Sequence, residues 1–268
     1  MGAVNAPFCV LTIAGSDSGG GAGIQADQRT IRAIGGHALT AITAVTAQDT
    51  RRITTWGVVP DSLIRAQVES ALGGYPVAAI KTGLLPGPGA IRAVSEGLAK
   101  FPSIPLVVDP VLASSSGTRF LSAVGARALR KSLFPRAFLI TPNWPEAAAF
   151  SGLPVRTHGQ AEKAGILLAR DCGRPFLVKG GHAPGGVCRD CLAMPSGDAI
   201  WYEFPRIASD NTHGTGCVLS AAIAAWLGRG ANLTEAVRLA HSFLQRALIR
   251  GRGLDWGGGR GPAFYGTR

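Results

Sequence analysis

Short apolar segments alternate with amphipathic segments along most of the chain, up to about Gly181. Several of the short segments are apolar at consecutive positions, which is typical of strands buried on both faces of a parallel sheet. The segments between them show helical spacing, as in residues 61–72, where Asp61 stands at the N-cap position. The expected strands begin at Phe8, Leu39, Val77, Ile104, Ala137 and Pro175.

The repeated alternation predicts strand–helix–strand units with right-handed crossovers. From Cys191 to Phe204 two extended runs flank the turn residues 195–198, which predicts a β-hairpin. Two helices then close the chain, one beginning near Gly214 and one near Asn232. Because no stretch resembles a linker, we predict a single α/β domain over residues 1–268, with a mostly parallel central sheet, helices on both faces and a small hairpin extension.

Composition narrows the class of protein. The chain has 268 residues, of which 46% are hydrophobic, and this is enough for a sizeable core. It lacks both an apolar run long enough to span a bilayer and an N-terminal signal pattern, so we expect a cytoplasmic protein that does not enter the membrane. The five cysteines are an odd number, which indicates free thiols in a reducing compartment.

The chain carries a formal net charge of +11, which suits an anionic partner. Its basic residues occur singly or in pairs such as Arg51-Arg52, without a lysine- and arginine-rich block or interleaved aromatic residues. This distribution argues against nucleic-acid binding and favours phosphorylated small molecules.

Polar residues follow the expected strands, where ligands bind in open α/β sheets. A glycine-rich stretch, residues 15–27, follows the first strand but matches neither a Walker A loop nor a dinucleotide fingerprint. It can equally be a tight turn, and Asp27 can equally favour the dipole of the next helix. Gln48 and Asp49 end the strand from Leu39, where turn residues are also common.

Two further strand ends carry oxygen ligands. Asp109 ends one strand, and Asn143 and Glu146 follow the next one. A spacing of one helical turn can direct both Asn143 and Glu146 at one hydrated Mg²⁺. Alternatively, Asn143 caps a helix with Glu146 in its first turn, and the two interpretations are compatible. Lys179 ends another strand beside two glycines, either as a solvated lysine or as a phosphate contact.

The stretch Gly214-Thr215-Gly216 precedes a helix, so its N–H groups predict an anion site. The same field predicts a lowered pKa for the thiol of Cys217. The alternatives are a thiol that merely packs in the core, or a nucleophile paired with His213, for which no acid is evident as an orienting partner.

Cys188 and Cys191 form a C-x-x-C pair. A structural zinc site needs two more ligands, and only His182 lies near in the sequence. We therefore do not expect zinc there.

Seven motifs, taken in order, resemble those of the hydroxymethylpyrimidine and phosphomethylpyrimidine kinase family of thiamine biosynthesis, within the ribokinase-like superfamily. The resemblance extends from about Cys9 to about Pro262. It implies a three-layer sandwich, a short lid, a homodimer, and transfer of the γ-phosphoryl group of ATP to the pyrimidine hydroxymethyl oxygen or to its monophosphate. The motifs are "LTIAGSDSGGGAGIQAD", "TAVTAQDT", "VVDPVL", "LITPNWPEA", "LVKGGH", "NTHGTGC" and "GRGP".

The resemblance also implies roles for individual residues. Substrate-binding residues would be Gln48, which would hydrogen-bond the aminopyrimidine edge, together with Asp27, Ala22 and Val111. Residues holding Mg²⁺ through water would be Asp109, Asn143 and Glu146. Residues near ATP would be Lys179, Thr141, His213 and Thr215. Catalytic groups would be the amides of Gly214, Gly216 and Cys217, with the Cys217 thiol in place of the aspartate base of most ribokinase-like sugar kinases.

Two departures from the family pattern bear on substrate and activity. The chain reads "KTGLL" at residues 81–85 where the family often has "KIGML", and Ser115 stands where the family has a lysine. Three alternatives therefore stay open: a pyridoxal or pyridoxine kinase of the same fold, a non-catalytic nucleotide or pyrimidine sensor, and a basic nucleic-acid-binding protein.

Overall fold

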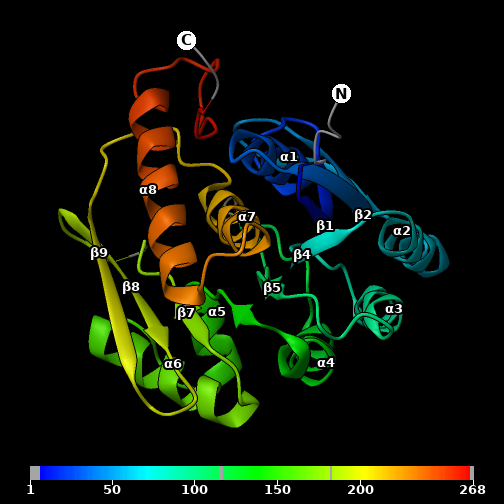
Figure 1. The fold of residues 1–268 in the computed structure, drawn as a ribbon. Helices are drawn as coiled ribbons and strands as arrows, with labels where there is room; N and C mark the ends of the chain where they lie inside the picture. Colours follow the sequence, from blue (N-terminus) through cyan, green and yellow to red (C-terminus); the bar gives the residue numbers. More distant parts are fainter. Residues whose placement is uncertain (1–6, 115–116, 182, 266–268) are drawn as a thin grey trace, which may run out of the picture.

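A central sheet of nine strands organises the part of the chain that this computed structural model describes, residues 7–114, 117–181 and 183–265 (Figure 1). The strand order is β3-β2-β1-β4-β5-β6-β7-β8-β9. Six neighbouring strands are parallel: β1 (Cys9–Asp17), β2 (His37–Gln48), β4 (Val77–Thr82), β5 (Leu106–Val108), β6 (Leu139–Ile140) and β7 (Phe176–Val178). Three strands run antiparallel to a neighbour: β3 (Ile53–Val58), β8 (Val187–Ala193) and β9 (Ala199–Pro205). The expected mostly parallel sheet and its hairpin, formed by β8 and β9, are confirmed.

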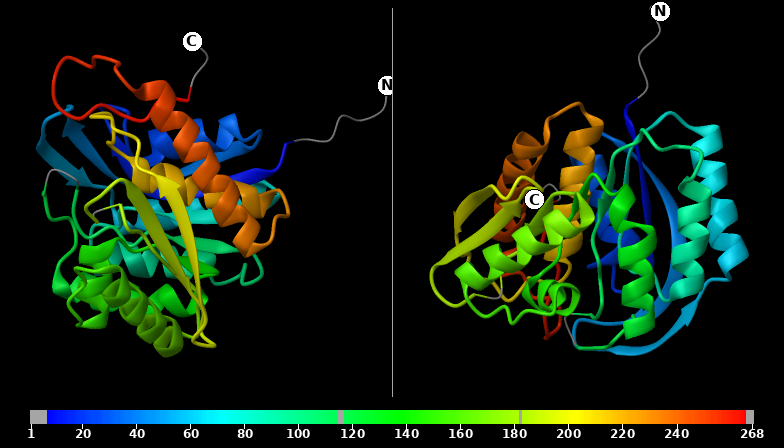
Figure 2. Two further views of the ribbon diagram at one scale, coloured as in Figure 1. Left: turned by 90° about the vertical axis from the view of Figure 1, so that its left-hand side faces the viewer. Right: turned by 90° about the horizontal axis from the view of Figure 1, so that it is seen from below.

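Helices cover both faces of the sheet, as the views in Figure 2 make clear. One face carries α1 (Gly23–Ala33), α7 (Thr215–Gly228) and α8 (Leu233–Gly251). The other carries α2 (Asp61–Gly74), α3 (Pro88–Leu98), α4 (Ala123–Ser132), the 3-10 helix η1 (Phe134–Arg136), α5 (Trp144–Ser151) and α6 (His158–Cys172). The three layers match the predicted sandwich. Within the described residues, no helix is long and apolar enough to cross a membrane.

The consecutive apolar residues of the strands supply two separate cores. In β1, Val10 packs into the core beneath α1 and α7, whereas Leu11 and Ile13 pack into the core beneath α2 and α3. Helix α7 is apolar on nearly all sides because it contacts the sheet, α1 and α8 at once. Most of the residues expected to carry chemistry therefore lie at strand ends and in loops, whereas a few polar side chains, such as Thr12 and Lys81, are buried within strands.

Strand β3 was not among the expected strands. It pairs with the end of β2 at the edge of the sheet, and all six of its residues are exposed or half-buried. Its sequence mixes threonines with Trp56 and has no apolar run, so the signal used for the buried strands was missing there.

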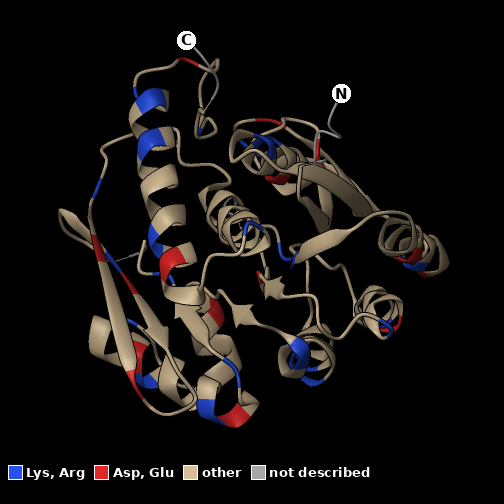
Figure 3. Ribbon diagram, viewed as in Figure 1, with Lys and Arg blue, Asp and Glu red and all other residues tan. Residues whose placement is uncertain are grey.

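The basic residues are dispersed in the structure, as they are in the sequence. In the view of Figure 3, lysine and arginine are spread over α4, α6, α8 and several loops rather than gathered on one element.

We expect Phe134→Ala to lower the free energy of unfolding by about 3–5 kcal/mol, because it removes a fully buried ring from the core. The Phe134 ring centroid lies 4.9 Å from that of Phe150 and 5.6 Å from that of Phe176. Urea unfolding followed by circular dichroism measures the change. Phe138→Ala is the matched control, because this side chain is 39% exposed and should cost less than about 1 kcal/mol. Equal losses would contradict this account of the core.

Candidate functional site

Asp109 lies at the centre of a polar group at the carboxyl edge of the sheet. Its Oδ1 is 2.8 Å from Nζ of Lys179, which follows β7. The hydroxyl of Thr141, after β6, donates to the same oxygen at 3.4 Å, and that of Ser220 in α7 donates to Oδ2 at 3.1 Å. The structure thus brings together Asp109, Thr141 and Lys179, three of the predicted site residues.

Lys179 supplies a lasting positive charge in this group. Burial on its own would lower the pKa of Lys179, but the carboxylates of Asp109 and Glu146 outweigh burial, and the pKa is raised. Gly216, in the first turn of α7, lies beside the pair: a Cβ added there would be 3.4 Å from Nζ of Lys179 and 4.0 Å from Oδ2 of Asp109. A cation and the positive end of a helix therefore face the same region.

Asn143 and Glu146 form a capping box at the start of α5. The Glu146 N–H donates to Oδ1 of Asn143 at 2.9 Å, and the Asn143 N–H donates to Oε2 of Glu146 at 2.8 Å. The capping interpretation therefore describes the structure, and it holds both side chains at the end of β6, close to Asp109.

The charged groups around Glu146 determine whether a metal ion could bind beside it. Burial raises the pKa of Glu146 to about 7, and the nearby charge of Asp109 adds to this, while Lys179 acts against it. Two carboxylates therefore share one lysine in a buried space. No three His, Cys, Asp or Glu side chains within the described ranges are grouped to hold a metal by themselves. The donor set of two carboxylates and an amide fits a hydrated Mg²⁺ that also binds substrate phosphates.

Asp27 is enclosed in a buried ion pair. Nζ of Lys81 in β4 lies 2.7 Å from Oδ2 and 3.0 Å from Oδ1 of Asp27, and the Thr12 hydroxyl donates to Oδ2. Neither charged side chain is exposed. In this structure both oxygens of the Asp27 carboxylate have protein partners, and the place of Asp27 in the substrate pocket stays a prediction. Lys81 was assigned no role from the sequence, although a lysine inside an apolar strand was the available signal.

Cys217 lies in the first turn of α7, with Gly214 as the N-cap residue at φ 75°. Burial raises the pKa of the Cys217 thiol to about 11, although the positive charge of Lys81 acts against the rise. The prediction of a lowered pKa is therefore wrong, because burial outweighs the positive charge of Lys81.

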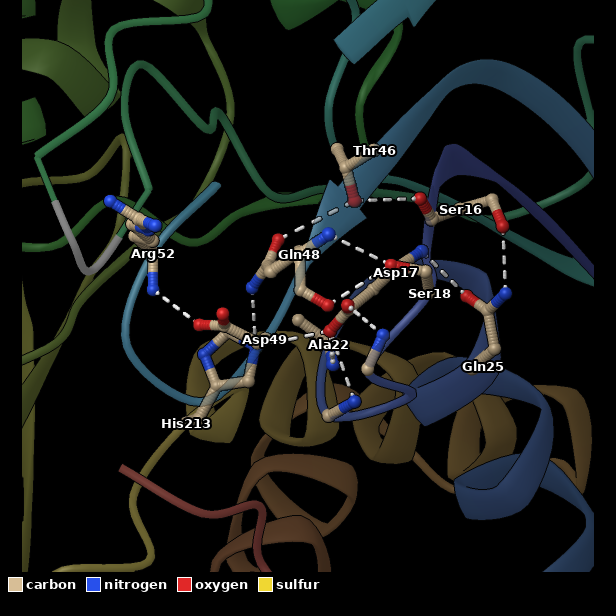
Figure 4. A network of polar contacts seen from close by, with 12 residues as sticks. Ser16, Asp17, Ser18, Ala22, Gln25, Thr46, Gln48, Asp49, Arg52 and His213 are labelled. Carbon is tan, nitrogen blue, oxygen red and sulfur yellow. Dashed lines mark hydrogen bonds and ion pairs between the residues drawn. The ribbon is translucent and has the colours of Figure 1, made fainter. Parts of the chain in front are cut away.

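Asp17 organises the glycine-rich loop after β1. Its Oδ1 accepts a hydrogen bond from the Gly19 N–H at 2.8 Å, and its Oδ2 accepts from the N–H groups of Gly21 and Ala22 at 3.0 and 2.8 Å (Figure 4). Gly214 packs directly on this loop, because a Cβ there would overlap the carbonyl oxygen of Gly21. The loop after β1 and the loop before α7 therefore form one surface.

Gln48 and His213 meet on that surface. Nε2 of Gln48 lies 2.9 Å from Nε2 of His213, and the same ring nitrogen is 3.1 Å from Oδ2 of Asp17 (Figure 4). His213 was expected near the nucleotide, but it contacts the residue expected to bind the pyrimidine. It also has the orienting acid that the sequence did not reveal, Asp17, which lies 196 residues away. A pocket of about 380 Å³ opens here, lined by residues 48–52, His213, Gly259 and Arg260.

The remaining predicted residues lie around this region. Ala22 contributes its N–H to Asp17, Thr215 begins α7, and Val111 packs on an apolar cluster that includes Leu84 of the "KTGLL" segment. Cys188 and Cys191 are free thiols. Ser115 and His182 lie outside the described residues.

Comparisons with known proteins give a consistent result. The sequence profile of the family described as phosphomethylpyrimidine kinase matches residues 17–263. The hydroxymethylpyrimidine/phosphomethylpyrimidine kinase of Rhizobium meliloti is 39% identical over 256 residues, which cover 95% of this chain and 96% of that protein. The chain spans only about half the length of bifunctional thiamine biosynthesis relatives, 46% in rice and 53% in Geobacter sulfurreducens.

Solved structures resemble this chain over nearly its whole length. The pyridoxal kinase of Bacillus subtilis, in an ADP complex, has a TM-score of 0.87 and 32% identity, covering 96% of this chain and 98% of that one. The phosphomethylpyrimidine kinase of Clostridium difficile has a TM-score of 0.78 and 36% identity, covering 90% of this chain and 99% of that one.

We expect Lys81→Met to lower the free energy of unfolding by about 3–5 kcal/mol, because it leaves the buried Asp27 carboxylate without its cation. Urea unfolding at neutral pH measures the loss. Asp27→Leu added to Lys81→Met should recover much of it, since no lone charge then stays buried. Arg65→Met, which breaks two ion pairs between half-exposed side chains, is the control and should cost far less. A loss no larger than that of the control would show that the buried pair contributes little.

Proposed function

The chain belongs to the phosphomethylpyrimidine kinase family, and from that premise we propose that it phosphorylates 4-amino-5-hydroxymethyl-2-methylpyrimidine and then its monophosphate. The phosphoryl donor is ATP, and the products serve thiamine biosynthesis. The observation that carries the proposal is the meeting of Lys179 and Asp109 with the first turn of α7. Phosphoryl transfer depends on positioning and on positive charge, and this arrangement offers both.

The rival acceptors are vitamin B6 vitamers, because a pyridoxal kinase shares the fold with a TM-score of 0.87. Sequence favours the pyrimidine. Identity is 39% to the Rhizobium meliloti pyrimidine kinase and 32% to the Bacillus subtilis pyridoxal kinase, each over at least 95% of this chain.

In this proposal the backbone N–H groups of Gly214, Gly216 and Cys217 stabilise negative charge on the phosphoryl group in transfer. Lys179 contacts the phosphates of ATP, beside Thr141 and Thr215. Gln48 binds the aminopyrimidine edge, with Ala22 and Val111 near the ring. Asp27 acts indirectly, by holding Lys81 next to Cys217.

We propose that Asp109, Asn143 and Glu146 hold Mg²⁺ through water. When bound, the ion would offset the negative charge of the ATP phosphates. The proximity of Glu146 and Asp109 to a single lysine supports this placement, because two carboxylates and one ammonium group leave room for a further cation.

The two acceptors place different demands on Cys217. The hydroxymethyl group must lose a proton when its oxygen bonds to phosphorus, whereas a phosphate monoester is already largely anionic at neutral pH. Only the thiolate of Cys217 can accept this proton, becoming the thiol. With a pKa of about 11 in the free protein the thiolate is scarce at neutral pH, which a loose transition state tolerates because the hydroxyl proton can leave late. In this proposal the thiolate takes up the hydroxyl proton in the first step, and no base is needed in the second.

We also propose that residues 1–268 act as one domain in a cytoplasmic homodimer whose ligands are small molecules, with no nucleic-acid or membrane partner. Sedimentation equilibrium of the purified protein tests the dimer.

Purified protein given MgATP and the hydroxymethylpyrimidine should form ADP, the monophosphate and then the diphosphate. Chromatography of the products and a coupled ADP assay measure this. We expect kcat/KM for the pyrimidine to exceed that for pyridoxal. Absence of ADP with either acceptor would overturn the kinase proposal, and ligand binding by calorimetry without turnover would favour a sensor instead.

Cys217→Ala should lower kcat for the hydroxymethyl acceptor by about 100-fold, the usual scale of a lost general base, with little change in KM. For the monophosphate acceptor the loss should stay below about tenfold, because no alcohol proton moves. Single-turnover assays with each acceptor give the two rates. Cys172→Ala, at the far end of α6, is the matched control and should leave both rates unchanged. Equal losses for the two acceptors would refute the base role.

A further inference from the structure

One ring nitrogen of His213 has two polar neighbours that place opposite demands on it. Nε2 of His213 lies 2.9 Å from the amide nitrogen of Gln48 and 3.1 Å from Oδ2 of Asp17 (Figure 4). A ring nitrogen carries either a hydrogen or a free lone pair. It therefore cannot donate to the carboxylate and accept from the amide NH₂ at the same time.

Asp17 decides which state the ring adopts. Its two oxygens accept three backbone N–H groups of the glycine-rich loop at 2.8–3.0 Å, which stabilises the ionised form. Burial tends to raise the pKa of Asp17, but the hydrogen bonds to His213 and to the backbone outweigh it, and the pKa is lowered. A carboxylate is only an acceptor, so Nε2 of His213 must carry the hydrogen.

The amide of Gln48 must then present its oxygen, not its nitrogen, to the ring. The two atoms have nearly the same shape, so turning the amide by 180° leaves the packing unchanged. With Oε1 in the near position, the His213 N–H is shared between Oε1 and the Asp17 carboxylate.

The far end of the same amide leads independently to the same orientation. With Nε2 of Gln48 toward His213, Oε1 of Gln48 lies 3.5 Å from the Thr46 hydroxyl. The single hydrogen of that hydroxyl is already donated to the Ser16 carbonyl at 3.1 Å. In the turned orientation the Gln48 NH₂ donates to a lone pair of the Thr46 oxygen instead. Both ends of the amide then have matched partners.

We propose that Asp17 and His213 are positioning residues that fix the Gln48 amide, with Oε1 toward His213 and Nε2 toward Thr46. After these bonds, the amide keeps one lone pair and one hydrogen for a ligand, in a set order. Gln48 and His213 both line the pocket of about 380 Å³, so a ligand can reach them. The ligand class rests on the proposed function: an aminopyrimidine, with its amino group on the His213 side and its ring nitrogen on the Thr46 side.

Nuclear magnetic resonance of the free, ¹⁵N-labelled protein tests the first half of the proposal without any assay of activity. Long-range ¹H–¹⁵N correlations distinguish the two tautomers of each of the five histidines, and His213→Asn identifies the signals of His213. We expect the Nε2–H tautomer at neutral pH, and a shift toward the Nδ1–H tautomer in Asp17→Asn. Asp198→Asn is the control: this carboxylate accepts a hydrogen bond from the Ser196 hydroxyl in the turn between β8 and β9, and it does not line this pocket. An Nδ1–H tautomer in the unaltered protein, or no change in Asp17→Asn, would overturn the proposal.

Steady-state kinetics test the second half. Asp17→Asn should raise KM for the hydroxymethylpyrimidine about tenfold, the scale of one lost hydrogen bond, with KM for ATP unchanged. Thr46→Val, which removes the acceptor at the other end of the amide, should raise the same KM and leave the His213 tautomer unchanged. Parallel increases in both KM values, in variants whose Tm is preserved, would refute the positioning role. If the protein lacks kinase activity altogether, the proposed function fails while the tautomer measurement still stands.

Discussion

The carboxylate of Asp109 joins four separate segments of the chain, and the arrangement of the site depends on it. It follows β5 and binds Lys179 after β7, Thr141 after β6 and Ser220 within α7. A parallel sheet brings the ends of neighbouring strands to one edge, but it does not dictate how a helix docks there. Ser220 connects Asp109 to the first turns of α7, where the Ser220 hydroxyl also lies within hydrogen-bond distance of the carbonyls of Gly216 and Cys217, and the helix amides lie beside the lysine.

Charge compensation explains why this edge contains so many ionisable groups. Lys81 is matched by Asp27, whereas Lys179 is shared by Asp109 and Glu146. The first pair is fully buried, and the positive charge of Lys81 lies near the Cys217 thiol. In the second, two carboxylates face one lysine, and this group borders the region where phosphates are proposed to bind. A group with more carboxylates than lysines favours partners that bring a cation with them.

The layers of the fold and the grouping at the sheet edge could be predicted because both follow from short-range patterns. Consecutive apolar residues indicate strands covered on both faces, and polar residues that end such strands share one edge. Lys81 could not be assigned from its apolar strand, because its partner Asp27 comes from a different element and becomes its neighbour only through packing. The pKa of Cys217 was predicted in the wrong direction, since the depth of its burial is a property of the folded chain. The contact between Asp17 and His213 spans 196 residues, beyond the reach of any local pattern.

The two proposed tasks of the site draw on different parts of the chain. The proposed phosphate side uses the ends of β5, β6 and β7 and the start of α5, whereas the proposed acceptor side uses the glycine-rich loop, the end of β2 and the loop before α7. They meet where Gly214 packs on Gly21 and α7 begins. Substitutions on the acceptor side could therefore change which ring is bound without altering the lysine and carboxylates that are proposed to contact the phosphates. Such a separation would account for the fold that a pyridoxal kinase shares with this chain, since the proposed phosphate side does not depend on how the acceptor is recognised.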